Sequence, residues 1–204
     1  MQRARQVAEE IFLALPSLQG EEIVPKNAYE KALCEKLGWT VFDNRYYDAF
    51  NGQSFIEIKK GQAGMHFDMV RYAEVLLGHG PEDTLTVFFR WKKKEKQITE
   101  AYIIDTKELI EFLRINKQFA QLYLQVKAQV PRGVNILASA TAKDLREMAC
   151  FSVNREGIFE RQRISNAAPR PSSTNRKWTQ QSIQHFLKQK RKSEDRRSIL
   201  YYLF

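Results

Sequence analysis

The fold of this chain depends most on one stretch, YYDAFNGQSFIEIKK at residues 46–60. Its second half alternates in polarity, with Ile56 and Ile58 on one face of an extended chain and Glu57 and Lys59 on the other. A period of two predicts a half-buried strand. Because the turn-forming residues 51–54 come just before it, the preceding residues supply an antiparallel partner. The stretch is therefore predicted to be a β-hairpin.

Two registers of this hairpin are compatible with its turn. If residues 52–53 form a two-residue loop with glycine first, Asp48 lies directly opposite Glu57. If residues 51–52 form the loop, Asp48 faces the position two before Glu57 and still shares the face of Glu57 and Lys59. Both registers bring two carboxylates and one ammonium group together.

This set of side chains predicts a particular chemistry. Two neighbouring carboxylates repel each other unless a cation lies between them, and hard oxygen ligands suit Mg²⁺, which keeps positions for water and phosphate. A lysine beside the metal can position or deprotonate an attacking water and stabilise the charge of the transition state. We therefore expect Asp48 and Glu57 to bind metal and Lys59 to support the water in phosphodiester hydrolysis.

The spacing of these residues resembles a known signature. Asp48, eight residues and then Glu57-Ile58-Lys59 are similar to the Asp…(Asp/Glu)-x-Lys motif of the PD-(D/E)XK nuclease superfamily, especially its type II restriction endonucleases. The similarity covers the hairpin and the helix expected before it. Tyr47 stands where the family often has proline.

This resemblance implies a fold, a cofactor and a further site residue. The fold would be α/β, with a central mixed β-sheet flanked by helices, and the cofactor would be Mg²⁺, for which Mn²⁺ can substitute. Related nucleases often present a glutamate from the helix before the hairpin toward the metal. Glu30, on the helix expected at residues 26–37, matches that role, and an exposed helix charge is the alternative.

A second carboxylate-x-lysine triplet occurs at Asp105-Thr106-Lys107. It follows an apolar strand pattern and precedes the helical pattern of residues 108–113. An aspartate or threonine at that junction is typical of a helix N-cap, so either Asp105 or Thr106 would cap the helix. We therefore expect this triplet to have a structural role.

The net charge of +9 is concentrated in the last quarter of the chain, because residues 151–204 contain 12 basic and 4 acidic residues. We expect a nuclease catalytic core at residues 1–153 and a basic C-terminal extension, an arm and helix, at residues 154–204, docked on the core or on a second subunit. The basic segment suits double-stranded DNA, and a solvated tail without a partner is the alternative.

Candidate DNA-binding residues follow the catalytic strand and continue in the arm. Residues 61–67 are expected to be a flexible polar segment beside the metal. Either Arg161 or Arg163 is expected to read a base. Arg170, Arg176 and Lys177 are expected mainly to hold phosphate. The full set is Lys60, Gln62, His66, Arg71, Arg161, Arg163, Arg170, Arg176 and Lys177.

Localisation and assembly follow from the remaining features. There is no signal-peptide core or apolar run of membrane-spanning length, and Cys34 and Cys150 lack metal-site spacing, so we expect a cytoplasmic protein with reduced thiols. The apolar residues 199–204 and the symmetry of palindromic DNA sites suggest a homodimer. The predicted function is Mg²⁺-dependent, sequence-specific cleavage of DNA by a type II restriction enzyme. The alternatives are a structure-directed repair or recombination nuclease and an inactive nuclease-like DNA-binding module.

Overall fold

The computed structural model describes residues 1–20, 29–42, 44–81, 83–92, 96–129 and 137–161. The helices are α1 (Gln2–Ala14), the 3-10 turn η1 (Leu15–Ser17), α2 (Tyr29–Leu37), α3 (Met69–Leu76), α4 (Thr106–Phe112), α5 (Lys117–Gln129) and α6 (Ala142–Met148). The strands are β1 (Thr40–Val41), β2 (Ala49–Phe50), β3 (Phe55–Gly61), β4 (Gly64–Asp68), β5 (Thr84–Lys92), β6 (Gln97–Asp105), β7 (Leu137–Thr141), β8 (Phe151–Asn154) and β9 (Gly157–Glu160).

Seven of these strands form one mixed sheet in the order β1-β2-β3-β5-β6-β8-β9. β3 and β5 are parallel, and every other neighbouring pair in this sheet is antiparallel. β4 and β7 form a separate antiparallel pair. The prediction of an α/β fold with a mixed central sheet is confirmed.

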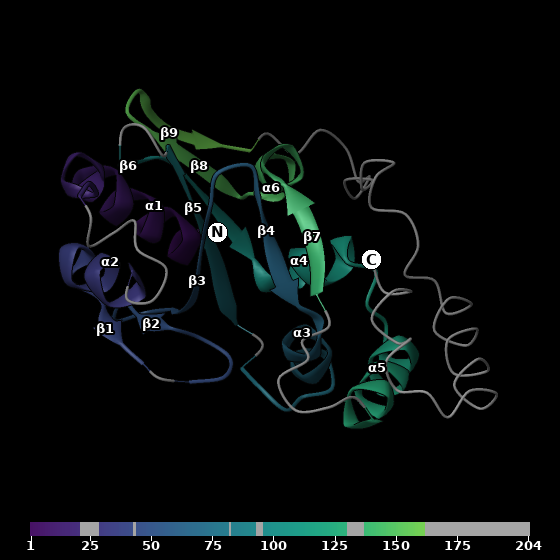
Figure 1. Ribbon diagram of the computed structural model, residues 1–204. Helices are drawn as coiled ribbons and strands as arrows, with labels where there is room; N and C mark the ends of the chain where they lie inside the picture. The colour runs from purple at the N-terminus through teal and green to yellow at the C-terminus, as the bar shows by residue number, and fades with distance from the viewer. Residues whose placement is uncertain (21–28, 43, 82, 93–95, 130–136, 162–204) are drawn as a thin grey trace.

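Helices cover both faces of the large sheet (Figure 1). α1 and α2 lie on one face, where Val7, Ile11 and Leu33 pack with Ile56 and Ile58 of β3. α3 to α6 and the β4–β7 pair lie on the other face, over a second apolar cluster. Burying each large aliphatic side chain contributes roughly 1.5–3 kcal/mol, so the alternation along β3 ties its apolar face to α1 and α2. Its polar face is thereby turned toward α3.

Two aspartates define where helices begin on the far side of the sheet. Asp68 accepts a hydrogen bond from the backbone nitrogen of Val70 at 3.0 Å and caps α3. Asp105 accepts one from the nitrogen of Lys107 at 2.8 Å and caps α4. The expected capping role of the second carboxylate-x-lysine triplet is therefore confirmed.

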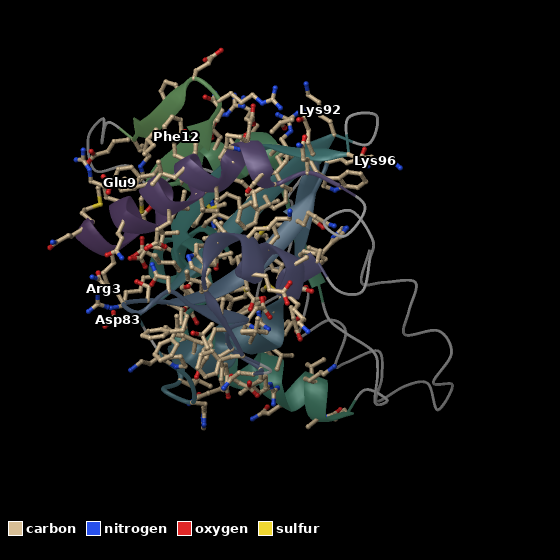
Figure 2. All side chains as sticks on the ribbon, turned by 90° about the vertical axis from the view of Figure 1, so that its left-hand side faces the viewer. Arg3, Glu9, Phe12, Asp83, Lys92 and Lys96 are labelled. Carbon is tan, nitrogen blue, oxygen red and sulfur yellow. The ribbon has the colours of Figure 1, made fainter. Side chains whose placement is uncertain are left out.

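The start of α1 approaches the segment that leads into β5. The nearest side-chain atoms of Arg3 and Asp83, labelled in Figure 2, are Nη1 and Oδ2 at 4.0 Å. Both side chains are more than half exposed, so this contact contributes little to stability.

The segment at residues 61–67 is not the flexible loop expected from its polar composition. Gly61 ends β3, and β4 begins at Gly64 and pairs residue by residue with β7. A Cβ on Gly61 would collide with the carbonyl oxygen of Gly64, and one on Gly64 would collide with that of Ala140. The two glycines allow a sharp connection that the pattern of polar residues did not reveal.

The large sheet also continues beyond residue 153, the expected end of the core. β9 pairs with β8, and Val153 lies opposite Ile158. The sheet therefore reaches Glu160, within the segment that was expected to be an arm from residue 154. Arg163, Arg170, Arg176, Lys177 and the apolar residues 199–204 lie outside the described residues. Within the described part of the chain, no helix is long and apolar enough to cross a membrane.

Candidate active site

The hairpin of β2 and β3 adopts the first of the two registers. Ala49 lies opposite Ile56, and the backbone nitrogen of Asp48 donates to the carbonyl of Ile56 at 2.9 Å. Asp48 comes directly before β2, outside the paired residues of the hairpin. Residues 52–53 form the loop, and Gly52 has a φ of +93°, a conformation that favours glycine. The first predicted register is confirmed for Ala49 and Phe50, and the meeting of Asp48 with Glu57 remains a prediction.

The turn of this hairpin is anchored to α1. Asn51 Oδ1 accepts hydrogen bonds from the backbone nitrogens of Gln53 at 3.1 Å and Ser54 at 2.8 Å. Asn51 Nδ2 donates to Glu10 Oε2 at 3.0 Å, and Trp39 Nε1 donates to the same oxygen at 2.8 Å. These bonds hold the two strands that carry Asp48 and Glu57 in one register.

One oxygen of Asp48 is fixed by the backbone. Its Oδ2 accepts a hydrogen bond from the nitrogen of Ile58 at 2.7 Å.

Burial, followed by the charges of Asp48 and Glu30, raises the pKa of the Cys34 thiol to about 12. The raised pKa keeps this thiol neutral near physiological pH. Cys34 is free and buried, which agrees with the expected reduced state.

Glu57 is the most unusual residue of the site, because a carboxylate with a side chain only 2% exposed lies in the middle of a strand. Lys59 Nζ and Arg71 Nη1 both contact its Oε1. Its Oε2 has no hydrogen-bond partner within the described residues. A buried carboxylate oxygen without a partner is costly, and a cation is the group that would satisfy it.

These residues fit a hard divalent cation held by few protein ligands. Among the described residues, no group of three or more histidine, cysteine, aspartate or glutamate side chains is arranged to hold a metal. Mg²⁺ is commonly held by one or two carboxylates, with water and substrate phosphate completing its coordination. Asp48 and Glu57 are the carboxylates that could supply such a pair, and Oε2 of Glu57, which has no hydrogen-bond partner among the described residues, is the atom best suited to it.

Lys59 and Lys60 project from opposite faces of β3. Lys59 shares the face of Glu57, whereas Lys60 Nζ lies 4.2 Å from the centroid of the Tyr29 ring on α2. Burial lowers the pKa of Lys60, and the nearby charge of Glu30 acts against that shift. Glu30 lies in the first turn of α2, next to Tyr29, and its role at a metal remains a prediction.

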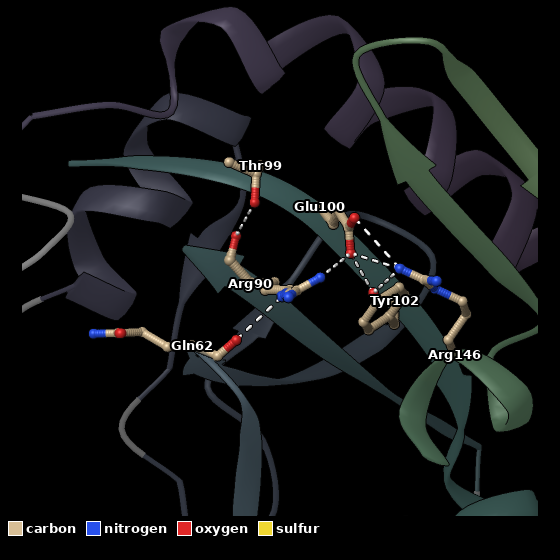
Figure 3. Close-up of polar contacts among 6 residues, drawn as sticks. All are labelled: Gln62, Arg90, Thr99, Glu100, Tyr102 and Arg146. Atoms are coloured by element: carbon tan, nitrogen blue, oxygen red, sulfur yellow. Dashed lines mark hydrogen bonds and ion pairs between the residues drawn. The ribbon is translucent and has the colours of Figure 1, made fainter. Parts of the chain in front are cut away.

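Gln62 and His66 occupy different surroundings. The carbonyl oxygen of Gln62 accepts a hydrogen bond from Arg90 Nε at 3.1 Å, while its side chain points away from this contact (Figure 3). Arg90 Nη1 in turn donates to Glu100 Oε2 at 3.1 Å, and Arg146 Nη2 donates to the same oxygen at 3.2 Å. His66 is exposed on β4, and its Nδ1 lies 2.7 Å from Ser139 Oγ on β7.

Two arginines expected to bind DNA contact the protein itself. Arg71, in the first turn of α3, reaches Glu57, and its Nε donates to the carbonyl of Arg45 at 2.7 Å. Arg161 Nη2 lies 2.9 Å from Glu108 Oε2, and its Nη1 donates to the last carbonyls of α6. Arg71 is thus the site residue whose role the sequence reasoning missed; its only signal was a position just after the Asp68 cap.

No protein-family model matches the chain, and no curated protein matches it in sequence.

Proposed function

We propose that the protein is a Mg²⁺-dependent DNA endonuclease, and that it acts sequence-specifically, as a type II restriction enzyme of the PD-(D/E)XK superfamily does. One observation carries the proposal. A buried glutamate in mid-strand, Glu57, contacts Lys59 and has one carboxylate oxygen without a hydrogen-bond partner among the described residues, and the next residue of its strand, Ile58, binds Asp48 Oδ2. Burying such a charge is difficult to explain by stability alone, since buried ion pairs are often no better than apolar packing.

Each side chain has a distinct role in this proposal. Mg²⁺ bound by Asp48 and Glu57 would polarise the scissile phosphate and activate a water. The hydrogen bond from Ile58 fixes Asp48, so that its carboxylate need not reorganise. Lys59, with a side chain 26% exposed, can reach an attacking water and stabilise negative charge on the phosphate.

Double-stranded DNA is the proposed substrate because of the chain's charge. The net charge of +9 suits a polyanion, and its excess lies after residue 150. We propose a cytoplasmic homodimer, since two copies related by a two-fold axis read a palindromic site most economically.

A plasmid cleavage assay tests the proposal. The protein should cut in Mg²⁺ or Mn²⁺ and be inactive in chelator, and Asp48→Asn should reduce the rate by about 100-fold or more. Sites mapped on plain plasmid DNA would share one sequence. Cleavage that persists in chelator, or an Asp48→Asn variant as active as the parent, would refute the proposed site.

Two other functions are separated by the same assay. Cleavage confined to branched or nicked DNA would identify a structure-directed nuclease. A protein that binds DNA without cutting it in any metal would be an inactive nuclease-like module. The contact of Arg71 with Glu57 favours this second candidate, because a guanidinium already neutralises the carboxylate expected to bind metal.

A further inference from the structure

Arg71 connects the two carboxylate-bearing segments of the candidate site. From the first turn of α3, its Nη1 contacts Glu57 Oε1 on β3. Its Nε donates at 2.7 Å to the carbonyl of Arg45, in the segment that leads to Asp48. The side chain of Arg71 is only 17% exposed, so most of it is buried beside Glu57.

α3 holds the segment before Asp48 by a second contact as well. Arg45 Nη2 lies 2.7 Å from Glu74 Oε1, one helical turn beyond Arg71. This second ion pair involves neither carboxylate of the candidate site. It therefore offers a matched control, because it joins the same helix to the same segment without touching Glu57.

The charges at Glu57 indicate what Arg71 does. Two cationic groups, Lys59 and Arg71, meet at a single buried carboxylate oxygen. A divalent cation at Glu57 would be repelled by a guanidinium within contact distance, and the repulsion is strong where water is excluded. One of the two cations must leave Glu57 when a metal binds. The proposed chemistry needs the ammonium of Lys59 in place, so Arg71 is the cation that leaves.

We infer that Arg71 is a positioning residue that competes with the divalent cation: it neutralises Glu57 in the metal-free protein and must leave Oε1 when the metal binds. The inference rests on the metal site proposed above. The carbonyl of Arg45 would keep the displaced side chain nearby, ready to return. The affinity of the DNA-free protein for the metal then depends partly on the exchange of Arg71 for the metal at Glu57.

Calorimetric titration of the DNA-free protein with Ca²⁺ tests the inference without measuring activity. Arg71→Met should bind Ca²⁺ at least about tenfold more tightly than the parent, since a full positive charge is removed from the ligand. Arg71→Lys, which keeps the charge, and Arg45→Gln, which breaks only the contact with Glu74, should bind like the parent. If Arg71→Met does not fold, Arg71→Gln replaces it and should show the same direction.

The possible outcomes separate this inference from the proposed function. If Arg71→Met binds Ca²⁺ no more tightly than the parent, while Glu57→Gln abolishes binding, the metal site stands and the competition is refuted. If neither the parent nor Arg71→Met binds Ca²⁺, the metal site itself is refuted and the inference falls with it. A parent without detectable binding beside an Arg71→Met variant that binds supports both.

Discussion

The chain contains the same pattern twice, Glu57-Ile58-Lys59 in β3 and Asp105-Thr106-Lys107 at the end of β6, and the structure uses the two differently. In β3 the chain stays extended, so the acid and the lysine project from one face and meet at Glu57 Oε1. At Asp105 the strand ends and α4 begins, so the acid caps the helix. The triplet becomes a candidate site only where the strand continues through it.

The surroundings of the two lysines differ accordingly. The side chain of Lys59 is 26% exposed and lies against a buried carboxylate. That of Lys107 is 57% exposed, and its Nζ lies 3.4 Å from Asp83 Oδ1, on a side chain that is itself 70% exposed. Charge pairs of the second kind contribute little to stability and offer no water-excluded site. The first triplet also has a second carboxylate bound to its strand, because Asp48 Oδ2 accepts a hydrogen bond from the nitrogen of Ile58.

The largest expected effect comes from changing the acids of the two triplets in parallel. Glu57→Gln should lower DNA cleavage by about 100-fold or more, because a neutral amide is a poor metal ligand and cannot replace the charge of the carboxylate. Asp105→Asn should leave cleavage within about twofold of the parent, since asparagine also caps helices well. Initial rates on supercoiled plasmid in Mg²⁺ measure both.

Circular dichroism spectra of both variants control for folding in this experiment. Equal losses of activity in folded Glu57→Gln and Asp105→Asn proteins would erase the distinction between the triplets and contradict the assignment of Glu57.

A smaller difference in cleavage rate is expected between variants of the two lysines. Lys59→Met should reduce the cleavage rate by roughly 10–100-fold or more without weakening DNA binding, because the ammonium acts on the water and on developing charge rather than on DNA affinity. Lys107→Met removes an exposed pair with Asp83 and should leave both properties unchanged. Single-turnover rates and gel-shift binding in Ca²⁺ measure the two properties separately. A Lys59→Met protein that cuts at the parental rate would remove the lysine from the site.

Much of this comparison could be predicted from local sequence, because it depends on residues close together in the chain. The alternation of residues 55–59 and the Gly52 turn determine a hairpin in which Ala49 pairs with Ile56 and Phe50 with Phe55. The caps at Asp68 and Asp105 likewise follow from residues within one helical turn.

The contacts that escaped prediction join separate elements. Arg71 reaches Glu57 only because α3 packs over the polar face of β3, and no spacing in the sequence encodes that packing. Lys60 likewise meets Tyr29 across the other face of the strand, through the packing of α2. The β4 strand was missed for a related reason, since its partner β7 lies more than 60 residues later in the chain.

The smallest predicted effect concerns the stability contributed by the second triplet. Asp105→Ala removes the side-chain oxygen that accepts from the nitrogen of Lys107, and should lower the free energy of unfolding by about 1 kcal/mol. Asp105→Asn should recover most of that loss, because its amide oxygen accepts the same hydrogen bond. Urea denaturation of the parent and both variants measures the difference. Cleavage by Asp105→Ala should stay at the parental rate at a temperature where the variant is fully folded. A stable Asp105→Ala protein that has lost cleavage would instead place Asp105 in the chemistry, since losing a helix cap alone affects activity only through unfolding.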